Sequence, residues 1–400
     1  AGADRKARIG GVKMGRFSFC LPPFAPDYSG VCGALFSLGG MIVIHDAAGC
    51  TGNYINYDEP RWYDGGSMVY CSGLRELDAV LGNDEKFIRN ICEAAKEMHP
   101  NFIALVGSPV PMVIGTDLAG MAAWIEDETG IPAFGFSTTG LGLYPSGAFL
   151  AGKTMLKHAM KTEKRQAEKA GMNILGDLPL DFAGTDFMER FRIQVQELGI
   201  QIRASLFDRA DMSQIDQIFS ARWNTAVSYS GALLGAWLCR TQNMPCVTGF
   251  SMSAATVEHW RAFAQEHADH DVAAWGAQEE MCGQKDGILI LGDQIIANSL
   301  RAEIYYVTGK CSCVGLPFGA QAESLGAGDR ILKNEEQIQK AVNDPEITVV
   351  IGDPLYRQLL DEPEKKRFLP VLHYAVSSKV GPGLCSDGGK IIEEIIVELS

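Results

Sequence analysis

The stretch Met41-Ile-Val-Ile-His-Asp-Ala-Ala-Gly-Cys50 decides the fold of this chain. Its first four residues form a short apolar run rich in β-branched side chains, which is typical of a strand buried in a parallel sheet. Small residues then lead the backbone from His45 and Asp46 to Cys50. Open α/β sheets bind their ligands beyond the carboxyl ends of their strands. Cys50 is therefore the first candidate for chemistry.

The same rhythm of apolar strand, glycine-containing turn and amphipathic helix repeats along the chain. It begins in the first third, restarts at 173–177 and restarts again at 287–293. Strands that alternate with helices form parallel sheets with right-handed crossovers. We therefore expect an α/β fold of three Rossmann-like domains, each a mainly parallel sheet flanked by helices. The expected domains are 1–165, which carries the cysteine segment, 166–284 and 285–400.

Later apolar runs predict further strands, among them 226–229, 303–308 and 370–374. Several strands end in Gly-Asp, but none is followed by Gly-x-Gly-x-x-Gly or by a phosphate loop with its lysine. We interpret these ends as tight turns between strand and helix. Rossmann-like topology therefore does not imply a bound nucleotide here.

Composition limits the function classes. Four hundred residues with 46% hydrophobic and 21% charged side chains indicate a soluble globular protein. No apolar run approaches the roughly 18 residues of a membrane span, and the basic start at 1–8 predicts a trimmed or disordered leader rather than a secretory signal. A net charge of −14 without a basic stripe argues against nucleic acid as a partner.

The cysteines favour a reducing compartment. There are 11, an odd number at uneven spacing, so they do not suggest a disulfide scaffold, and we expect a cytoplasmic protein. No Cys-x-x-Cys pair occurs. Ligands of a metal would therefore come from distant parts of the chain or from another subunit.

The residues around Cys50 leave three interpretations open. Gly49 and Gly52 let the backbone near the thiol approach a bulky ligand. The thiolate could bind an iron–sulfur cluster, act as a nucleophile with His45 as its base, or be a buried structural cysteine. Cys71 ends a strand at the same sheet edge, and we expect it near a cluster without binding it.

Two more cysteines are candidates. Cys20 precedes the rigid extended segment Leu21-Pro-Pro-Phe-Ala-Pro26, where a metal ligand and a plain cysteine are equally good interpretations. Cys385 lies in the glycine-rich turn 381–389 and is a candidate for lining a cofactor cavity between domains.

Together these motifs resemble component 1 of nitrogenase and its relatives. A Tyr-Ser-Gly turn at 28–30 precedes a helix, a strand that ends in His45, and the segment His45-Asp-Ala-Ala-Gly-Cys50, which keeps all but the first glycine of the family's His-Gly-x-x-Gly-Cys. Residues 108–118 are similar to the family's segment ending Val-Ile-Gly-Asp-Asp-Leu. The resemblance is specific through about residue 150 and topological beyond it.

The chain also departs from that family. The family's three cluster cysteines per subunit would fall near Pro26, at Cys50 and near Pro109, so only the middle one is in register, while Cys20 lies six residues early. The resemblance thus implies an iron–sulfur cluster, P-cluster-like or a smaller [4Fe–4S] cluster shared between subunits, with Cys50 and Cys20 as the expected ligands; the missing cysteines favour the smaller cluster. The positions of the catalytic subunit's cofactor cysteine and histidine align with Val227 and with a place near Leu384, beside Cys385.

The resemblance implies an oxidoreductase subunit, closer to the beta type than to the cofactor-holding alpha type. It would receive electrons through an inter-subunit iron–sulfur cluster and pass them to a substrate or to a second complex iron–sulfur cofactor. The implied partners are a homologous component 1 subunit and an ATP-dependent iron–sulfur reductase, which would bind the ATP; such systems work anaerobically. A scaffold for maturing a complex iron–sulfur cofactor is the alternative.

Overall fold

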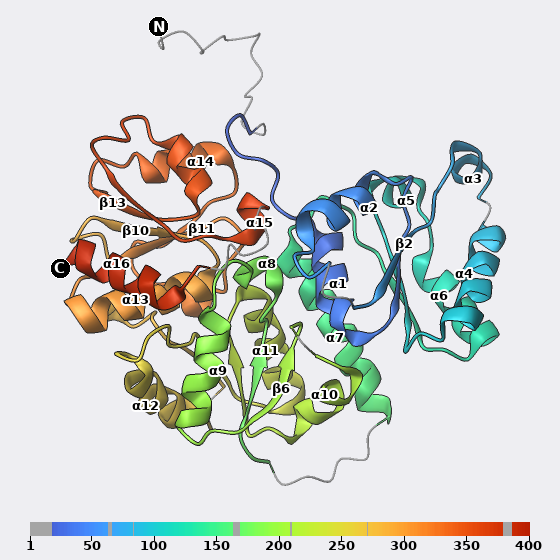
Figure 1. Cartoon of the computed structure of the whole chain (residues 1–400), viewed down its shortest axis with the longest axis horizontal. Helices are drawn as coiled ribbons and strands as arrows, with labels where there is room; N and C mark the ends of the chain where they lie inside the picture. The colour runs from blue at the N-terminus through green and yellow to red at the C-terminus, as the bar shows by residue number, and fades with distance from the viewer. Residues whose placement is uncertain are drawn as a thin grey trace, which may run out of the picture.

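The computed structural model describes residues 18–62, 66–82, 84–162, 169–208, 210–269, 271–378 and 386–400. Three separate parallel sheets, each flanked by helices, follow one another along the chain (Figure 1). The expected α/β fold is confirmed. Among the described residues, no helix has both the length and the apolar composition of a membrane span.

The first sheet has the strand order β2-β1-β3-β4, and every pairing in it is parallel. Its strand β1 is the run Met41–Ile44, which is fully buried at the centre of the sheet. The elements of this region are α1 (Asp27–Leu35), η1 (Phe36–Leu38), β1, α2 (Gly49–Asn53), η2 (Tyr54–Asp58), β2 (Met68–Cys71), α3 (Glu76–Leu81), α4 (Asp84–Met98), β3 (Ile103–Val106), α5 (Pro109–Ile114), α6 (Leu118–Thr129), β4 (Ala133–Phe136) and α7 (Tyr144–Thr162).

The second sheet has the order β6-β5-β7-β8-β9. Its elements are β5 (Met172–Leu175), α8 (Pro179–Phe182), α9 (Phe187–Glu197), β6 (Ile202–Leu206), α10 (Met212–Gln217), η3 (Ile218–Ser220), β7 (Trp223–Ala226), α11 (Tyr229–Gln242), β8 (Cys246–Thr248), α12 (Val257–His267) and β9 (Val272–Ala274).

The third sheet has the order β12-β11-β10-β13-β14. Its elements are η4 (Glu279–Met281), β10 (Ile288–Leu291), α13 (Gln294–Thr308), β11 (Cys313–Leu316), η5 (Ala322–Ser324), β12 (Arg330–Ile331), α14 (Glu335–Val342), β13 (Val349–Gly352), η6 (Pro354–Leu359), β14 (Arg367–Pro370), α15 (Tyr374–Ser377) and α16 (Gly388–Leu399). The exact boundaries between the domains stay predictions.

Three predicted strands are wrong in place or type. Residues 303–308 form the end of α13, whose start is capped by the side chain of Asp293, so a continuous helix overrides the strand propensity of Ile304-Tyr-Tyr-Val. Strand β7 ends at Ala226 because Ser228 caps the next helix. Strand β14 ends at Pro370 rather than beginning there.

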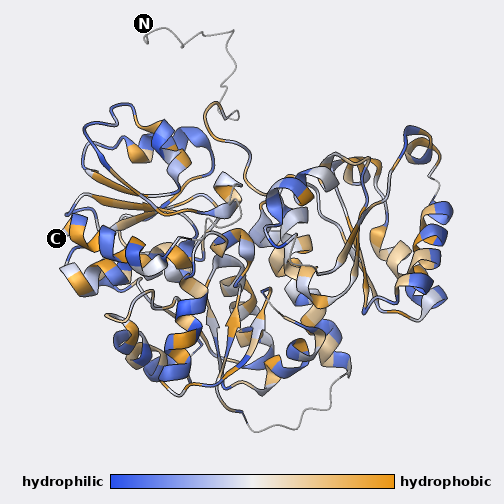
Figure 2. Cartoon of the chain, viewed as in Figure 1, coloured by the Kyte–Doolittle hydropathy of each residue, from blue (hydrophilic) through white to orange (hydrophobic). Residues whose placement is uncertain are grey.

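The three regions share buried apolar contacts. One hydrophobic cluster contains Val31, Leu234, Leu289 and Tyr374, which come from all three parts of the chain. Figure 2 shows the hydrophobic strands inside each sheet and the mixed surfaces of the covering helices. Helices α1 and α7 cross in direct contact, because a Cβ placed on Gly30 would lie 1.9 Å from the backbone oxygen of Tyr144. This close contact fixes α1 against α7 within the first domain.

Candidate metal centre

A single carboxylate organises the edge beyond strand β1. Oδ2 of Asp46 accepts backbone hydrogen bonds from Ala48 at 2.9 Å, Cys50 at 2.8 Å and Thr51 at 3.2 Å. An aspartate that bonds to the backbone two residues later is typical of an Asx turn. Asp46 therefore fixes the loop that carries Cys50 into helix α2.

This loop contains strained backbone. Ala48 has φ +129°, a value that L side chains rarely adopt. Strained residues persist where the surrounding structure determines them, and they cluster at functional sites. The strain lies two residues from the candidate thiol.

The thiol of Cys50 is half-buried and has polar neighbours. Burial and the negative charge of Asp46 raise its pKa, whereas a hydrogen bond from the Tyr28 hydroxyl acts in the opposite direction. Cys50 also makes a side-chain hydrogen bond to Asp46. The free thiol is therefore protonated near neutral pH, and a ligand that binds thiolate would displace its proton.

His45 does not serve Cys50 as a base. Its Nδ1 lies 2.9 Å from the Ser72 hydroxyl, and its ring packs on Phe87 with 4.5 Å between the centroids. Burial lowers the pKa of His45. Within the described part of the chain, no hydrogen bond joins His45 to Cys50, so the geometry gives the nucleophile hypothesis no support.

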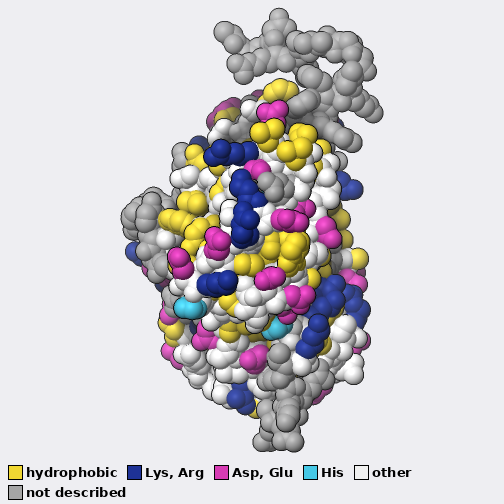
Figure 3. Space-filling view, turned by 90° about the vertical axis from the view of Figure 1, so that its right-hand side faces the viewer, with side chains coloured by type: hydrophobic (Ala, Val, Ile, Leu, Met, Phe, Trp, Pro, Cys, Tyr) yellow, Lys and Arg dark blue, Asp and Glu magenta, His cyan; other side chains and the backbone are white. Residues whose placement is uncertain are grey.

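The surroundings of Cys50 are open. A Cβ placed on Gly49, Gly52 or Gly73 would have nothing within 4 Å. The nearby end of the sheet also carries α3 and α5 (Figure 1), whose apolar side chains are exposed; Leu77, Val80 and Leu81 of α3 and Val113 of α5 are each more than 70% exposed. Figure 3 shows hydrophobic side chains gathered towards the top of this side of the molecule, among acidic and basic ones.

Cys71 lies at the same edge as Cys50, as predicted. It ends β2 and pairs in register with Ile44, the last residue of β1. Its Sγ donates a hydrogen bond to the backbone oxygen of Asp46 at 3.3 Å and accepts one from Gly73 N–H at 3.4 Å. Asp46 therefore contacts both thiols.

The resemblance puts the family's two other cluster cysteines near Pro26 and Pro109, and these prolines also lie at this edge. Pro109 and Tyr28 both pack against Gly140, whose added Cβ would lie 2.7 Å from Pro109 and 3.5 Å from Tyr28. Since Tyr28 bonds to Cys50 and follows Pro26 closely, the positions 26, 50 and 109 gather at one sheet edge. Only the middle position supplies sulfur.

Cys20 lies near the third sheet. It is exposed, and its N–H donates to Oε2 of Glu335 in α14 at 3.0 Å, as do the neighbouring N–H groups of Phe19 and Leu21 to the same carboxylate. Among the residues that the structure describes, no three His, Cys, Asp or Glu side chains come together to hold a metal. Cys385 and Leu384 lie outside the described residues, so the cofactor-binding role of Cys385 stays a prediction.

A buried polar junction lies between the three sheets. Tyr144 donates to the Asp181 carboxylate and lies 3.5 Å from Nε2 of His373. Burial raises the pKa of the nearby Asp293 to about 7. A small cavity of about 30 Å³ is lined by Asp181, Asp293 and His373 among other residues.

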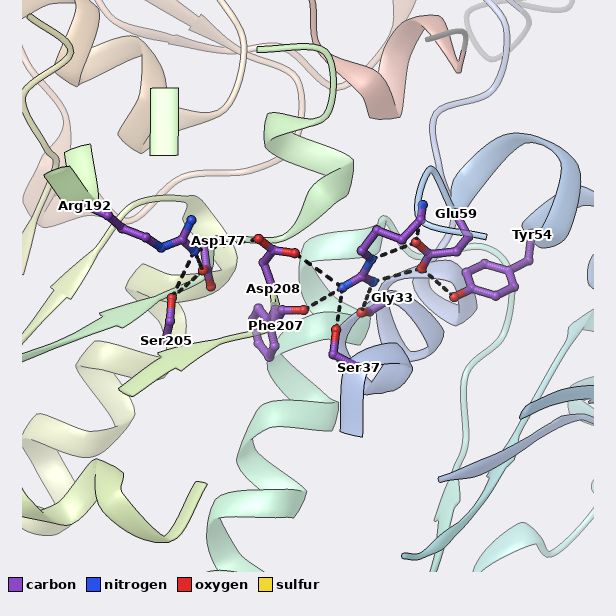
Figure 4. A network of polar contacts seen from close by, with 10 residues as sticks. Gly33, Ser37, Tyr54, Glu59, Asp177, Arg192, Ser205, Phe207 and Asp208 are labelled. Carbon is purple, nitrogen blue, oxygen red and sulfur yellow. Dashed lines mark hydrogen bonds and ion pairs between the residues drawn. The ribbon is translucent and has the colours of Figure 1, made fainter. Parts of the chain in front are cut away.

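The far end of the Cys50 segment forms a seam with the second sheet (Figure 4). Glu59, whose side chain is 1% exposed, accepts from Tyr54 Oη at 2.8 Å and from Arg61 Nε at 2.8 Å. Arg61 also donates to the backbone oxygens of Gly33 at 2.7 Å and Phe207 at 2.8 Å. We call this ion pair matched, because residues of the same chain supply hydrogen-bond partners for both of its side chains.

Sequence reasoning did not find the roles of Asp46, Tyr28 or Arg61. For Asp46 a local signal exists, because an aspartate before small residues is typical of a turn that caps the following helix. For Tyr28 and Arg61 no local signal exists, since their contacts join residues far apart in the sequence.

Fold and edge together define a class: a three-domain α/β protein that presents a half-buried thiol at an open sheet end, where the described residues offer too few ligands to enclose a metal. The chain belongs to the nitrogenase component 1 type oxidoreductase family, whose model matches residues 27–281. This confirms the resemblance seen in the sequence. The preference for the beta type of subunit stays a prediction.

Two curated relatives illustrate the range of the family. The chain is 25% identical over 213 residues to the nitrogenase molybdenum-iron protein alpha chain of Methanosarcina barkeri, covering 50% of this chain and 39% of that one. It is 26% identical over 177 residues to the nitrogenase iron-molybdenum cofactor biosynthesis protein NifE of Clostridium pasteurianum, covering 41% and 38%. The chain thus matches about two fifths of the length of either relative.

Solved structures agree with the fold over nearly the whole chain. The structure "Nitrogenase Cp1 at pH 5" superposes with a TM-score of 0.65 and 14% identity, covering 96% of this chain and 89% of that one. "Nitrogenase Cp1 at pH 6.5" superposes with a TM-score of 0.64 and the same identity. At this identity the likeness concerns the fold alone.

Proposed function

We propose that this chain is a subunit of a nitrogenase-like two-component reductase. It receives electrons from an ATP-dependent iron–sulfur reductase through an inter-subunit iron–sulfur cluster and passes them to a substrate or cofactor. The observation that carries the proposal is the half-buried thiol of Cys50 at the open end of the first sheet. Membership of the oxidoreductase family supports it.

The residues at this edge fit a cluster that two chains share. Cys50 is the sulfur donor at this edge, Cys71 lies near it, and the glycines beside them leave open space. Asp46 holds the loop, and the Tyr28 hydroxyl bonds to the sulfur of Cys50. An iron–sulfur cluster bound here would supply one-electron transfer, at a potential that such hydrogen bonds to sulfur tune. The thiol of Cys50 would be deprotonated on binding it.

The partners follow from the same surface. The exposed apolar side chains of α3 and α5 beside the thiols suit burial against a homologous subunit or a docking reductase. ATP would bind the reductase, because this sequence carries no phosphate-loop pattern. We also propose that the protein is cytoplasmic and functions under anaerobic conditions.

Cofactor maturation is the second candidate function. Two observations favour it: one matched relative is a cofactor biosynthesis protein, and two of the three family cysteine positions carry proline here. A carrier with few ligands would release its cargo more readily than a permanent holder.

Anaerobic purification tests the proposal. We expect brown protein with stoichiometric iron and sulfide and a low-potential electron paramagnetic resonance signal. Cys50→Ala should lose iron, whereas Cys92→Ala, a control in the buried face of α4, should retain it. Reduced product in the presence of reductase and ATP supports the reductase, whereas cofactor transfer without turnover supports the scaffold. Wild-type protein that takes up no iron contradicts both.

A further inference from the structure

We infer that Cys71 is a second sulfur ligand beside Cys50, and that a second copy of this chain completes the site with the same two residues. The inference rests on the proposed function, namely that an iron–sulfur cluster binds at this edge. It departs from our expectation that Cys71 lies near a cluster without binding it, and it replaces Cys20 as the second ligand.

The two thiols share a neighbour, Asp46. Cys50 bonds to the carboxylate of Asp46, and Sγ of Cys71 donates to the backbone oxygen of the same residue at 3.3 Å. Cys71 ends β2 in register with Ile44, the last residue of β1, and Cys50 follows β1 at the start of α2. Both cysteines therefore lie beyond the same end of the sheet and contact the same residue.

Both thiols are partly exposed to solvent. Cys50 and Cys71 are half-buried, whereas Cys32 and Cys92 of the same domain are buried among apolar side chains. Gly73 leaves open space beside Cys71, and its N–H bonds to the Cys71 sulfur at 3.4 Å. Backbone N–H groups that bond to sulfur stabilise thiolate ligands and tune clusters. Cys71 is thus accessible and already has a donor in place.

The number of thiolates at this edge requires a second chain. A [4Fe–4S] cluster takes about four thiolates, and among the described residues this edge offers two. Two copies related by a two-fold axis present the same patch to each other, so each contributes Cys50 and Cys71. The exposed apolar side chains of α3 and α5 would then be buried around the site. This arrangement reaches four ligands with no other type of chain.

Cys20 is a poor alternative. Its backbone and that of its neighbours bond to Glu335 of α14, beside the third sheet. Moving Cys20 to Cys50 would break these charge-assisted hydrogen bonds. Cys20 is therefore the matched control: an exposed cysteine that should not bind iron.

The test reconstitutes the chain alone, without other subunits, with iron and sulfide under anaerobic conditions. We expect about two iron atoms per chain, that is about four per pair, and a dimer by light scattering. Cys71→Ser should lose more than about half of the iron and change the electron paramagnetic resonance signal, whereas Cys20→Ser should change neither. Circular dichroism verifies that each variant is folded.

A second measurement does not depend on iron. Phenylarsine oxide binds two adjacent thiols, so the apo-protein should take up one reagent per chain at this edge, and Cys50→Ser and Cys71→Ser should each abolish that uptake. Because it is made on the wild-type protein first, this measurement stands even if a variant unfolds.

The outcomes separate the two ideas. If the wild type binds iron and Cys71→Ser retains all of it, the inference is wrong and the proposed function stands. The inference is also wrong if Cys20→Ser loses the iron, or if the loaded chain is a monomer. If the wild type binds no iron, the proposed function fails and the inference fails with it.

Discussion

The two ends of the segment 45–62 differ in whether this chain supplies the partners of their polar groups. At one end, Cys50 presents a half-buried thiol beside open space, on a loop strained at Ala48. At the other end, Arg61 and Glu59 form an ion pair whose hydrogen bonds are all satisfied by residues of this chain. The same segment thus carries an unmatched site, the thiol, and a matched one, the ion pair.

The difference indicates where another molecule is needed. Buried charges are tolerated when the same chain supplies their partners, and such a network joins domains. The thiol of Cys50, beside open space and exposed apolar side chains, is not enclosed by such a network. We therefore assign structure to the Arg61 end and partner binding to the Cys50 end, and four predictions on the unfolding of the apo-protein test this division.

Breaking the matched end should have the largest effect. Arg61→Met leaves Glu59 buried without its cation, and such a change costs about 3–5 kcal/mol. Urea unfolding measures it. Arg222→Met is the control, because the pair Arg222–Asp269 is more than half exposed and is worth about 0–1 kcal/mol.

A second substitution separates charge from packing. Adding Glu59→Gln to Arg61→Met removes the unpaired charge and should restore much of the lost stability. Equal losses in the Arg61 and Arg222 variants would mean that the seam is no more than a surface contact.

Asp58, between the two ends, should give a pH dependence. Burial raises its pKa to about 6 from 3.8, although Ser29 and Asn53 donate to it. The folded state therefore binds the proton more tightly than the unfolded state. The contribution of Asp58 to the free energy of unfolding is fully present below about pH 4. It is lost as the pH rises through about 6, and the loss amounts to about 3 kcal/mol.

The measurement is urea unfolding between pH 4 and pH 8. Asp58→Asn keeps an oxygen acceptor but cannot ionise, so its stability should vary less over this range and exceed that of the wild type at pH 8. A wild-type curve that rises between pH 4 and pH 6, with an Asn variant that follows it, would contradict the assignment.

Two tyrosines allow a matched comparison of the ends. Tyr54→Phe removes a donor from the buried Glu59 carboxylate and should cost about 1–2 kcal/mol. Tyr28→Phe removes the hydroxyl that bonds to Cys50, and we expect it to cost less than about 1 kcal/mol in the apo-protein, because neither partner is a buried charge. A larger loss at Tyr28 would reverse the comparison.

Much of the fold was predictable from local pattern. The run 41–44 is buried and apolar, and the structure places it at the centre of the first sheet. Where prediction failed, at 303–308, the residues favour strands individually, but the capped helix α13 that begins nine residues earlier includes them. The strand propensity of single residues is thus overridden when they continue a helix that has already begun.

Less of the site was predictable. Cys50 stood out because it follows a buried strand and lies between glycines, and Cys71 because it ends the adjacent strand. The hydrogen bond from Tyr28 to Cys50 and the contact of Arg61 with Phe207 depend on how distant segments pack. No single stretch of sequence carries that information.

The smallest effect should come from the strain at the unmatched end. Ala48→Gly places glycine where φ is +129°, and we expect it to stabilise the apo-protein by about 1 kcal/mol. Ala94→Gly inside helix α4 should do the reverse by a similar amount, because glycine is unfavourable there. Both are read from the same urea curves. If Ala48→Gly brings no gain, the conformation at position 48 costs no more than the extra freedom of glycine in the unfolded chain, and the contrast between the two ends would then lie in their ligands alone.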